Sequence, residues 1–366
     1  MPPGPSRLAL LGTGLIGASL GLAVRRRHPE VEVVGTDANP SHVEAALAMG
    51  ALSRAAASGP EAVAGADLVV LAAPLDAIPG LLREIGPHLV PGALVTDVGS
   101  VKGSVMRAAA DALPEAVRVV GGHPMAGAAV GGPGSADALL FENAAYVLTP
   151  PRGVDDLAVY APEALWLVAA VGARPVVMEA DRHDVVAATV SHLPQLLAVA
   201  LVAEAADAGP DALGLAAGGF RDMTRIAGSP FSMWGPILRD NAEAVTDVLD
   251  RFAGRLGALR ARIDADPASV GRLFEASGRT RADLPTSSKG FLAPLADVVV
   301  WAEDRPGFLH ALTGVIAEAG LNLKDAELLR IREGVTGTFR FGFATGPEAD
   351  RAVAAFTEAG YRATRR

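Results

Sequence analysis

The chain has 366 residues, half of them hydrophobic, and this length is enough for two or three domains that each bury a core. Its formal net charge of −9 at pH 7 argues against nucleic acid or a membrane surface as a partner, because both require clustered cations. The chain has no cysteine, so disulfides and cysteine metal sites are excluded. We expect a cytoplasmic protein without a bound metal.

A glycine-rich turn follows the first apolar segment. Residues 8–11 have the pattern of a buried strand, and Gly12, Gly14 and Gly17 follow with GxGxxG spacing at the start of an apolar helix expected over residues 15–24. The first glycine permits a tight turn, the second lets the backbone approach a pyrophosphate, and the third lets the helix pack closely on the strand. This context predicts a dinucleotide site.

The choice of dinucleotide depends on the residues around this turn. Phosphates would bind at the start of the helix, near Leu15 and Ile16, where N–H groups are free. Asp37 ends the second apolar strand, expected over residues 31–36, where a ribose 2'-hydroxyl would lie. A carboxylate repels a 2'-phosphate, and no Arg or Lys follows at positions 38–42. We therefore predict NAD rather than NADP; the alternative is a glycine turn without a ligand.

Up to about residue 151, short apolar strands alternate with helical stretches, which predicts an N-terminal Rossmann-type, doubly wound α/β sheet. Further strands are expected over residues 68–73, 94–97, 117–121 and 146–149. A last helix and strand, over residues 157–171 and 175–178, complete a domain that we assign to residues 1–178. Ligands of such sheets bind beyond the carboxyl ends of the strands, which makes Ala73 and Pro74 candidates for cofactor contact.

Two polar side chains follow other strands of the predicted sheet. His123 comes directly after one strand, where a nicotinamide would meet its substrate, and is a candidate general base. Ser100 occupies the matching place after another strand and is a candidate to hydrogen-bond the substrate or the cofactor. The alternatives are that His123 only caps its strand, and that Ser100 is the N-cap of a helix over residues 101–113.

The next part of the chain, assigned to residues 179–276, predicts an all-α domain. Helices are expected over residues 181–208, 211–217, 233–240 and 243–264. Apolar residues lie on more than one face of these helices, so we expect a homodimer formed through this domain. Pro194 predicts a kink that could present Ser191 to a cleft, while His183 and His192, taken singly, are typical of structural histidines.

A polar segment at residues 218–225 interrupts the apolar helices. Its arginines, Arg221 and Arg225, carry planar guanidinium groups that suit a carboxylate, or either could pair with Asp222 at the surface. Residues 277–294 lack apolar periodicity at their start and are assigned to a linker.

The last unit, residues 295–366, shows a βαββαβ order. Its elements are expected at residues 296–302, 308–319, 321–332, 337–344 and 348–359, with a short strand at the end.

Five segments in order, GTGLIGASL, DVGSVK, GGHPMAG, SHLPQ and GGFRDMTRIAGSPFSMW, resemble the prephenate and arogenate dehydrogenase family across nearly the whole chain. The first is shared by many enzymes, whereas GGHPMAG, SHLP and GGFRDxTRIA are specific. The last unit, with DRPGFL at residues 304–309, resembles an ACT domain, a small amino-acid-sensing module. Its ligand would lie near Asp304, Pro306, Gly307 and Asn322, and tyrosine is the expected effector.

The resemblance implies an oxidative decarboxylation. Hydride leaves the hydroxyl-bearing ring carbon of a cyclohexadienyl substrate for NAD, the ring carboxylate departs as CO2, and an aromatic ring forms. His123 would accept or hold the proton of the ring hydroxyl, Ser100 would orient it, and Arg225 would bind the ring carboxylate. The other residues that the resemblance implies in this cleft are Asp184, Ser191, Gln195, Gly218, Asp222 and Trp234.

Two departures from the family bear on the substrate. Gln195 stands where many relatives carry a histidine, and an acidic residue near Ala129 is missing. The neutral amide removes a cation from the neighbourhood of the substrate side chain, which leaves both prephenate and arogenate open, with prephenate as the default.

The sequence argues against two other functions. Hydroxyacid dehydrogenases of the 6-phosphogluconate type use a lysine in the helical domain, and no lysine lies between residues 102 and 289 here. A noncatalytic sensor of NAD and an amino acid would need neither His123 nor Arg225.

Overall fold

The computed structural model describes residues 4–127, 131–282, 295–302, 305–330 and 337–365. Contacts between residues divide the chain into two compact units, Met1–Pro267 and Ala268–Arg366.

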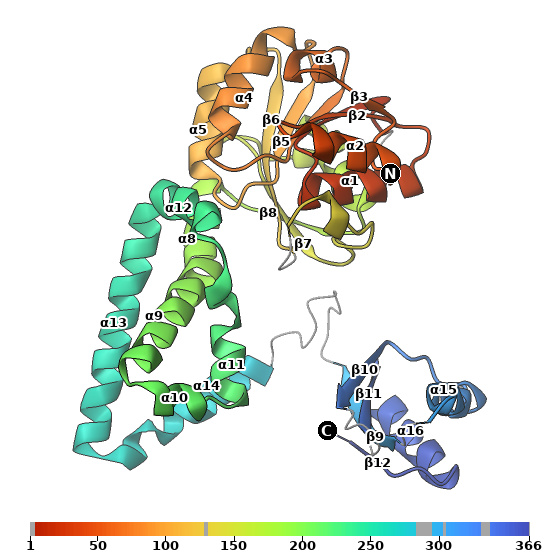
Figure 1. Ribbon diagram of the computed structural model, residues 1–366, viewed down its shortest axis with the longest axis vertical. Coiled ribbons are helices and arrows are strands. Elements are labelled where there is room, and N and C mark those ends of the chain that lie inside the picture. The colour runs from red at the N-terminus through yellow and green to blue at the C-terminus, as the bar shows by residue number, and fades with distance from the viewer. Residues whose placement is uncertain (1–3, 128–130, 283–294, 303–304, 331–336, 366) are drawn as a thin grey trace. The chain divides into compact units, whose positions relative to one another are not determined.

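The first unit contains an eight-stranded sheet with strand order β3-β2-β1-β4-β5-β6-β7-β8 (Figure 1). The strands are β1 Arg7–Leu11, β2 Glu32–Thr36, β3 Arg54–Ala55, β4 Leu68–Leu71, β5 Leu94–Asp97, β6 Arg118–Pro124, β7 Ala145–Thr149 and β8 Arg174–Val177. In register, Leu8 of β1 lies opposite Val33 of β2 and Leu68 of β4. Neighbouring strands pair in parallel from β3 through β2, β1, β4 and β5 to β6, and β7 and β8 are also parallel. Strands β6 and β7 pair antiparallel. The predicted Rossmann-type sheet is confirmed.

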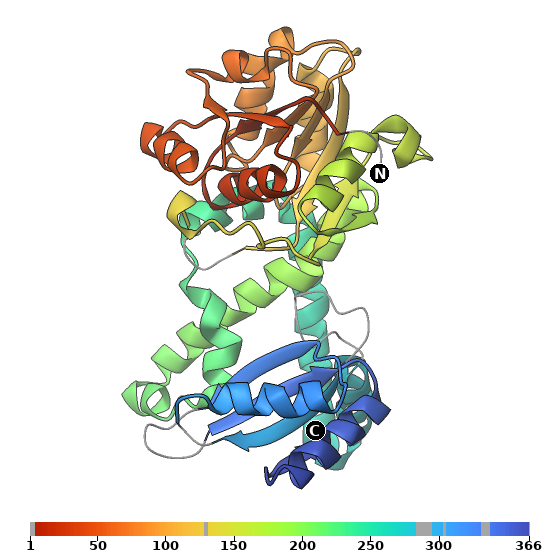
Figure 2. The same ribbon diagram turned by 90° about the vertical axis from the view of Figure 1, so that its right-hand side faces the viewer.

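Helices cover both faces of this sheet (Figure 2), and alternate residues of its strands belong to different cores. Leu8 and Leu10 pack with helices α1 (Leu15–Arg27) and α7 (Pro162–Ala170), whereas Ala9 and Leu11 pack with α4 (Ile78–Ile85) and α5 (Gly103–Ala112). The remaining helices of this region are α2 Pro40–Ala48, α3 Gly59–Val63 and α6 Leu157–Tyr160, with 3-10 turns at Gly86–His88 and Pro133–Ser135. Because both faces are buried, ligands have access at the strand ends.

The helical part of the first unit follows β8. Its helices are α8 Ala180–Ala187, α9 Leu193–Asp207, α10 Pro210–Gly214, α11 Gly218–Thr224, α12 Phe231–Asp240 and α13 Ala242–Ala265, with a 3-10 turn at Arg225–Gly228. The interruption predicted at Pro194 is a π-helical turn, Ala188–His192. Proline lacks an N–H and crowds the preceding turn, and a wider turn before it relieves that crowding.

The continuous run Ala180–Asp207 has 28 residues, and an 18-residue window within it has a mean hydropathy of 1.9, so length and composition alone would let it cross a membrane. Within the run, however, His183, Asp184, His192 and Gln195 are buried. Asp184 also accepts hydrogen bonds from the start of α5. These contacts anchor the start of the run in the globular unit, while only 33% of the apolar window is buried.

The second unit begins with a 3-10 turn, Pro267–Val270, that spans the division, followed by helix α14, Gly271–Ala282. Its sheet has the order β10-β11-β9-β12, with β9 Ala296–Ala302, β10 Asp325–Arg330, β11 Gly337–Phe343 and β12 Ala363–Arg365. Neighbouring strands are antiparallel. Helices α15 Phe308–Glu318 and α16 Gly346–Glu358 contribute Phe308, Leu312 and Phe356 to a core with Phe341 and Phe343. The βαββαβ order is confirmed.

Two expectations at element boundaries were wrong. Residues 277–282, expected to start a linker, form the end of α14; residues 283–294 lie outside the described residues. Alanine and arginine favour a helix without an apolar stripe, and α14 has no buried residue. Residues 321–324 do not continue β10, because Gly320 turns the chain with φ +63° after α15, and residues 331–332 lie outside the described residues. The domain bounds 1–178, 179–276 and 295–366 stay predictions.

Candidate active site

The glycine turn after β1 brings two backbone segments unusually close. Gly12 has φ +98°, and a Cβ added there would lie 2.4 Å from the Ala72 carbonyl oxygen. A Cβ added at Gly17 would lie 2.0 Å from the Gly12 carbonyl oxygen. At Gly14 an added Cβ would meet nothing within 4 Å. Gly12 and Gly17 are therefore required by packing, while Gly14 leaves open space at the start of α1.

This open space fits a dinucleotide. Gly14 is the N-cap of α1 and supplies no side-chain hydrogen bond, so the first N–H groups, including those of Leu15 and Ile16, have neither an intrahelical acceptor nor a cap. Asp37 follows β2 and is held by the N–H groups of Thr13 (2.6 Å) and Asn39 (2.8 Å). This carboxylate is fixed beside the turn, as ribose recognition requires.

Of the two residues predicted after β4, Ala73 lies beside the same turn. Its backbone nitrogen would be 2.9 Å from a Cβ added at Gly12. Pro74 follows, and its carbonyl accepts the N–H of Ala77 at 2.9 Å. The loop after β4 thus forms one wall of the cradle.

His123 belongs to a chain of three side chains that starts on β6 and ends on α8. Its Nδ1 atom lies 2.8 Å from Nε2 of His183, and Nδ1 of His183 lies 2.8 Å from Oδ1 of Asp184. Asp184 also accepts the backbone N–H groups of Lys102 and Gly103, each at 2.7 Å. The Asp184 carboxylate, from the helical part, therefore caps the N-terminus of α5.

The proton positions along this chain follow from its last member. Burial by itself would raise the pKa of the Asp184 carboxyl, but hydrogen bonds from His183 and the two backbone N–H groups lower it overall. An ionised carboxylate only accepts, so His183 donates through Nδ1, and its Nε2, when unprotonated, accepts from His123. His123 then donates through Nδ1 and retains a lone pair on Nε2.

His123 is also held in its neutral form. Burial, followed by the nearby positive charge of Lys102, lowers the pKa of His123 well below 6.5. The residue is half-buried, so part of it remains accessible. A neutral, oriented imidazole with a free Nε2 lone pair is a proton acceptor.

A second buried histidine supports this arrangement. Burial lowers the pKa of His192 to about 4, so its Nδ1 is free to accept from the Asn241 amide, 3.2 Å away. The same amide donates to the Asp184 backbone carbonyl at 2.9 Å. The His192 ring lies edge-on to Trp234, with 5.7 Å between ring centroids. Asn241, just before α13, thus holds α8 in place through the backbone carbonyl of Asp184.

Asp97 and Lys102 form a buried ion pair at the end of β5. Asp97 accepts the N–H groups of Gly99 at 2.8 Å and Gly122 at 3.0 Å. Lys102 Nζ bonds to Asp97 and donates to the Gly122 carbonyl at 2.7 Å. Sequence reasoning missed both residues as site components. The signal was present in the DVGSVK motif, which places the sole lysine before residue 289 inside an apolar region.

Ser100 is half-buried between Gly99 and α5. The alternative in which it caps the following helix was wrong, since α5 begins at Gly103 with Lys102 as its N-cap residue. Asp184 supplies the hydrogen bonds that a serine cap would have made. The Ser100 hydroxyl is therefore not consumed as a helix cap.

The other predicted substrate residues lie on the helical part. Ser191 is half-buried in the π-helical turn, and buried Gln195 donates to the Ile226 carbonyl at 3.0 Å. Trp234 packs on the sheet core, and its Nε1 is buried with no partner among the described residues. Three further residues, on α11 and the turn after it, are exposed and make no hydrogen bond to His123 or Ser100 among the described residues: Gly218, Asp222 and Arg225. The structure thus joins Asp184 to His123, and leaves the position of Arg225 near the substrate as a prediction.

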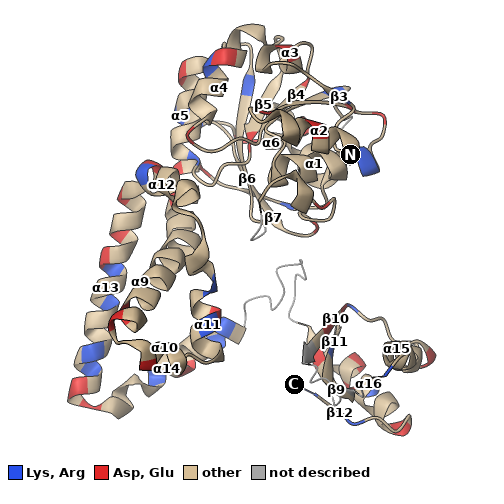
Figure 3. Ribbon diagram, in the orientation of Figure 1, with Lys and Arg blue, Asp and Glu red and all other residues tan. Residues whose placement is uncertain are grey.

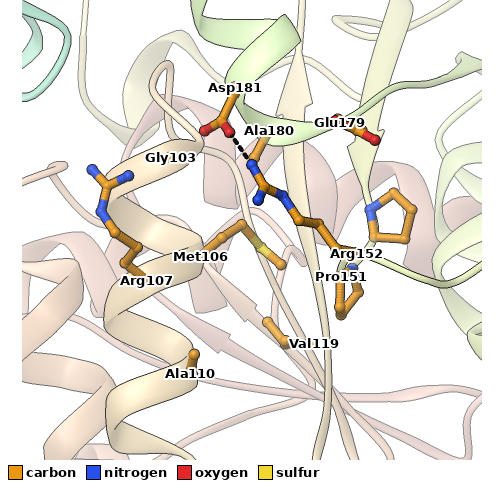
Figure 4. A pocket seen from close by; sticks show the side chains of 11 residues that line it. Gly103, Met106, Arg107, Ala110, Val119, Pro151, Arg152, Glu179, Ala180 and Asp181 are labelled. Carbon is orange, nitrogen blue, oxygen red and sulfur yellow. Dashed lines mark hydrogen bonds and ion pairs between the residues drawn. The ribbon is translucent and has the colours of Figure 1, made fainter.

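A pocket of about 410 Å³ opens where α5, the loop after β7 and the start of α8 meet (Figure 4). Its wall includes Met106 and Arg107, and Arg152 reaches across it to Asp181 at 2.5 Å. None of the predicted catalytic, substrate or cofactor residues lines it. It is distinct from the His123 site.

Of the predicted effector residues, Gly307 has φ +80° and is the N-cap of α15, directly after Pro306. Asn322 is exposed after that helix. Asp304 lies outside the described residues, as does Ala129, where an acidic residue is missing.

Comparisons with known proteins agree along most of the chain. Residues 20–177 match the nucleotide-binding domain of prephenate dehydrogenase, residues 179–275 match the dimerization domain of prephenate dehydrogenase, and residues 296–355 match the ACT domain. The chain is 33% identical over 350 residues to a prephenate dehydrogenase of Bacillus subtilis, with 94% of each chain covered.

Solved structures give the same result. An arogenate dehydrogenase of Synechocystis superposes with a TM-score of 0.67 at 30% identity, over 75% of this chain and 98% of that one. A prephenate dehydrogenase of A. aeolicus, in complex with hydroxyphenyl propionate and NAD+, superposes with a TM-score of 0.70 at 28% identity, over 77% of this chain and 99% of that one.

The Rossmann-type sheet with its glycine cradle, and the oriented histidine at the strand ends, define an NAD-dependent dehydrogenase. More particularly, the chain belongs to the prephenate dehydrogenase family and carries an ACT domain.

Proposed function

We propose that the chain oxidises and decarboxylates prephenate with NAD, producing 4-hydroxyphenylpyruvate for tyrosine biosynthesis. One observation carries this proposal beyond family membership: the hydrogen-bonded series His123, His183 and Asp184 fixes a neutral imidazole with its Nε2 lone pair free. An oriented proton acceptor at the strand ends suits a substrate whose hydroxyl loses a proton as its carbon is oxidised.

Each residue then has a chemical role. NAD, when bound, supplies the acceptor for hydride from the hydroxyl-bearing ring carbon. His123 accepts the hydroxyl proton at Nε2, and Ser100 orients that hydroxyl. Arg225 holds the ring carboxylate until its carbon–carbon bond breaks, after which the bonding electron pair completes the aromatic ring. Loss of CO2 and aromatisation make the reaction effectively irreversible.

The test is NADH formation by the purified full chain with NAD and prephenate, with NADP as control. The wild type should turn over prephenate, and His123→Asn should lower kcat/KM by about 100-fold or more. The matched control His88→Asn changes an exposed histidine and should leave the rate unchanged. Retention of the wild-type rate and pH profile by His123→Asn would remove His123 from the role of base.

Arogenate is the second candidate substrate, favoured by the neutral amide of Gln195. That amide is buried and hydrogen-bonded to Ile226, so it brings no positive charge to the substrate side chain. Offering arogenate in the same assay separates the two readings. Turnover of arogenate alone would replace prephenate as the substrate.

We also infer that the protein acts as a cytoplasmic homodimer regulated by tyrosine. Support for the dimer comes from exposed apolar side chains on the helical part, including Leu215 at 83% and Phe231 at 76% exposure. Most of α9 is free of charged residues, whereas α13 carries both signs (Figure 3). Sedimentation of the purified chain tests the homodimer. Inhibition of the full chain by tyrosine tests the regulation.

A further inference from the structure

We propose that Asp97 and Lys102 are positioning residues that hold Ser100 and His123 at a fixed separation across the cleft. The inference rests on the proposed function, because it assigns these residues to the same reaction. Neither side chain touches the substrate in this proposal; each acts through the backbone that carries a catalytic residue.

The Asp97 carboxylate bridges the two segments. Oδ2 accepts the N–H of Gly99, which directly precedes Ser100, at 2.8 Å. Oδ1 accepts the N–H of Gly122, which directly precedes His123, at 3.0 Å. One rigid side chain on β5 thus sets the position of both segments.

Lys102 completes the attachment of Gly122. Its Nζ donates to the Gly122 carbonyl at 2.7 Å, so both backbone groups of that glycine are bound to the ion pair. The backbone N–H of Lys102 donates to Asp184, which orients His183. The lysine therefore binds the peptide before His123 and the carboxylate that orients the His123 ring.

Strand β6 is tightly packed at Gly121 and Gly122. A Cβ added at Gly122 would lie 2.3 Å from the Asp97 carbonyl oxygen, and one added at Gly121 would lie 2.3 Å from Thr149 Oγ1. The side chain of Lys102 is fully buried and that of Asp97 is nearly so. A Cβ added at Gly121 would also lie 3.2 Å from Cδ of Lys102, so β6 packs closely against β5, β7 and the lysine side chain.

The position of the pair argues for function rather than stability. Burying two charges is costly, and apolar residues of similar volume often stabilise a core as well or better. Lys102 also supplies a positive charge near His123 that favours the neutral ring. The other ionisable groups that face this ring are His183, Asp184 and His192. Geometry and charge both act on the proton acceptor.

The decisive variant is the double substitution Asp97→Asn with Lys102→Met, which removes both charges with little change of volume. The control is Arg118→Met with Glu163→Gln, which removes another ion pair of the same domain, with Arg118 on the same strand as His123. For each full-length protein we would measure the melting temperature, NAD affinity, kcat and KM for prephenate, and the pH profile of kcat/KM.

The double variant should stay folded and bind NAD, yet lose about 100-fold in kcat, because small misplacement of reacting groups has that effect. Its KM should change much less, and the acid limb of its pH profile should move to higher pH as the positive charge near His123 disappears. The control should stay within about threefold of the wild type in kcat, as expected for a structural ion pair.

Three outcomes would overturn the proposal. The first is a double variant with wild-type kcat and pH profile. The second is an equal loss in the control, which would mark a general structural effect. The third is a double variant that does not fold while the control does, since the pair would then serve stability. A wild type inactive with both substrates would instead refute the proposed function.

Discussion

Burial of His192 couples the stability of the protein to pH. The histidine is 1% exposed, and burial lowers its pKa to about 4. In the unfolded chain its pKa is about 6.5, so between these values the unfolded state binds more protons than the native state. The contribution of His192 to the free energy of unfolding therefore decreases as the pH falls from about 6.5 to about 4.

We predict that His192→Gln flattens this dependence. Glutamine can accept from Asn241 but does not titrate, so the melting temperature should fall less steeply below about pH 6.5 than in the wild type. Thermal denaturation across this pH range measures the slope, and His88→Gln, at an exposed site, should keep the wild-type slope. An unchanged slope in His192→Gln would mean that His192 is not held neutral by burial.

Asp184 carries the second prediction at this scale. In Asp184→Asn a neutral amide replaces the ionised acceptor of three hydrogen bonds, so His183 loses its fixed proton position. We expect kcat to fall by about 10- to 100-fold, with a smaller change in KM, in steady-state assays with prephenate. Asp181→Asn, on an exposed turn of the same helix, is the control. Equal kcat values in the two variants would contradict a role of Asp184 in orienting the base.

At the scale of elements, different glycines of the turn between β1 and α1 serve packing and ligand binding. Gly17→Ala places a Cβ 2.0 Å from a backbone oxygen, so we predict destabilisation by about 1–3 kcal/mol. A Cβ added at Gly14 would meet nothing within 4 Å. The melting temperature of the Gly14→Ala variant should therefore match that of the wild type, while its NAD affinity falls. Calorimetry with and without NAD measures both effects. A stable Gly17→Ala variant, or Gly14→Ala with full NAD affinity, would contradict this division.

The same turn shows what local sequence can predict. GxGxxG spacing between an apolar strand and an apolar helix is a local pattern, and the structure shows the close approaches that the first and third glycines permit. An interruption of the helix before Pro194 was likewise predictable, because proline affects the residues just before it, but its form as a π-helical turn was not predicted.

Long-range pairs were not predictable in this way. The Lys102 backbone and Asp184 are 82 residues apart, and His123 and His183 are 60 apart, so no spacing rule joins them. His183 was taken singly for a structural histidine because a sequence cannot show which partner its ring meets. Asp97 and Lys102 are only five residues apart, yet their shared partner Gly122 lies on another strand.

At the scale of the whole molecule, the hydrophobic cores are divided between the two units. The clusters formed on both sheet faces and in the helical part lie within the first unit, and the cluster around Phe341 and Phe356 lies within the second. Separate cores unfold as separate cooperative units when little free energy couples them.

We therefore predict more than one transition in differential scanning calorimetry of the full chain. NAD should raise the transition of the first unit, and tyrosine, the proposed effector, should raise that of the second. Asn322→Ala, in the proposed effector site, should abolish the tyrosine shift and keep the NAD shift. A single transition raised by both ligands would show that the units unfold together.

The hydrogen bonds of Asp184 have a consequence for the order of events in a catalytic cycle. This carboxylate is carried by α8, while the N–H groups that it accepts belong to the start of α5 and the ring that it orients contacts β6. Lifting α8 away would free the N-terminus of α5 and release the His123 ring in one movement. His123 is thus oriented as a proton acceptor only while α8 stays packed against α5 and β6. Any movement of α8 during product release would therefore also release the base from its orientation, and the contacts of Asp184 would have to form again before the next turnover.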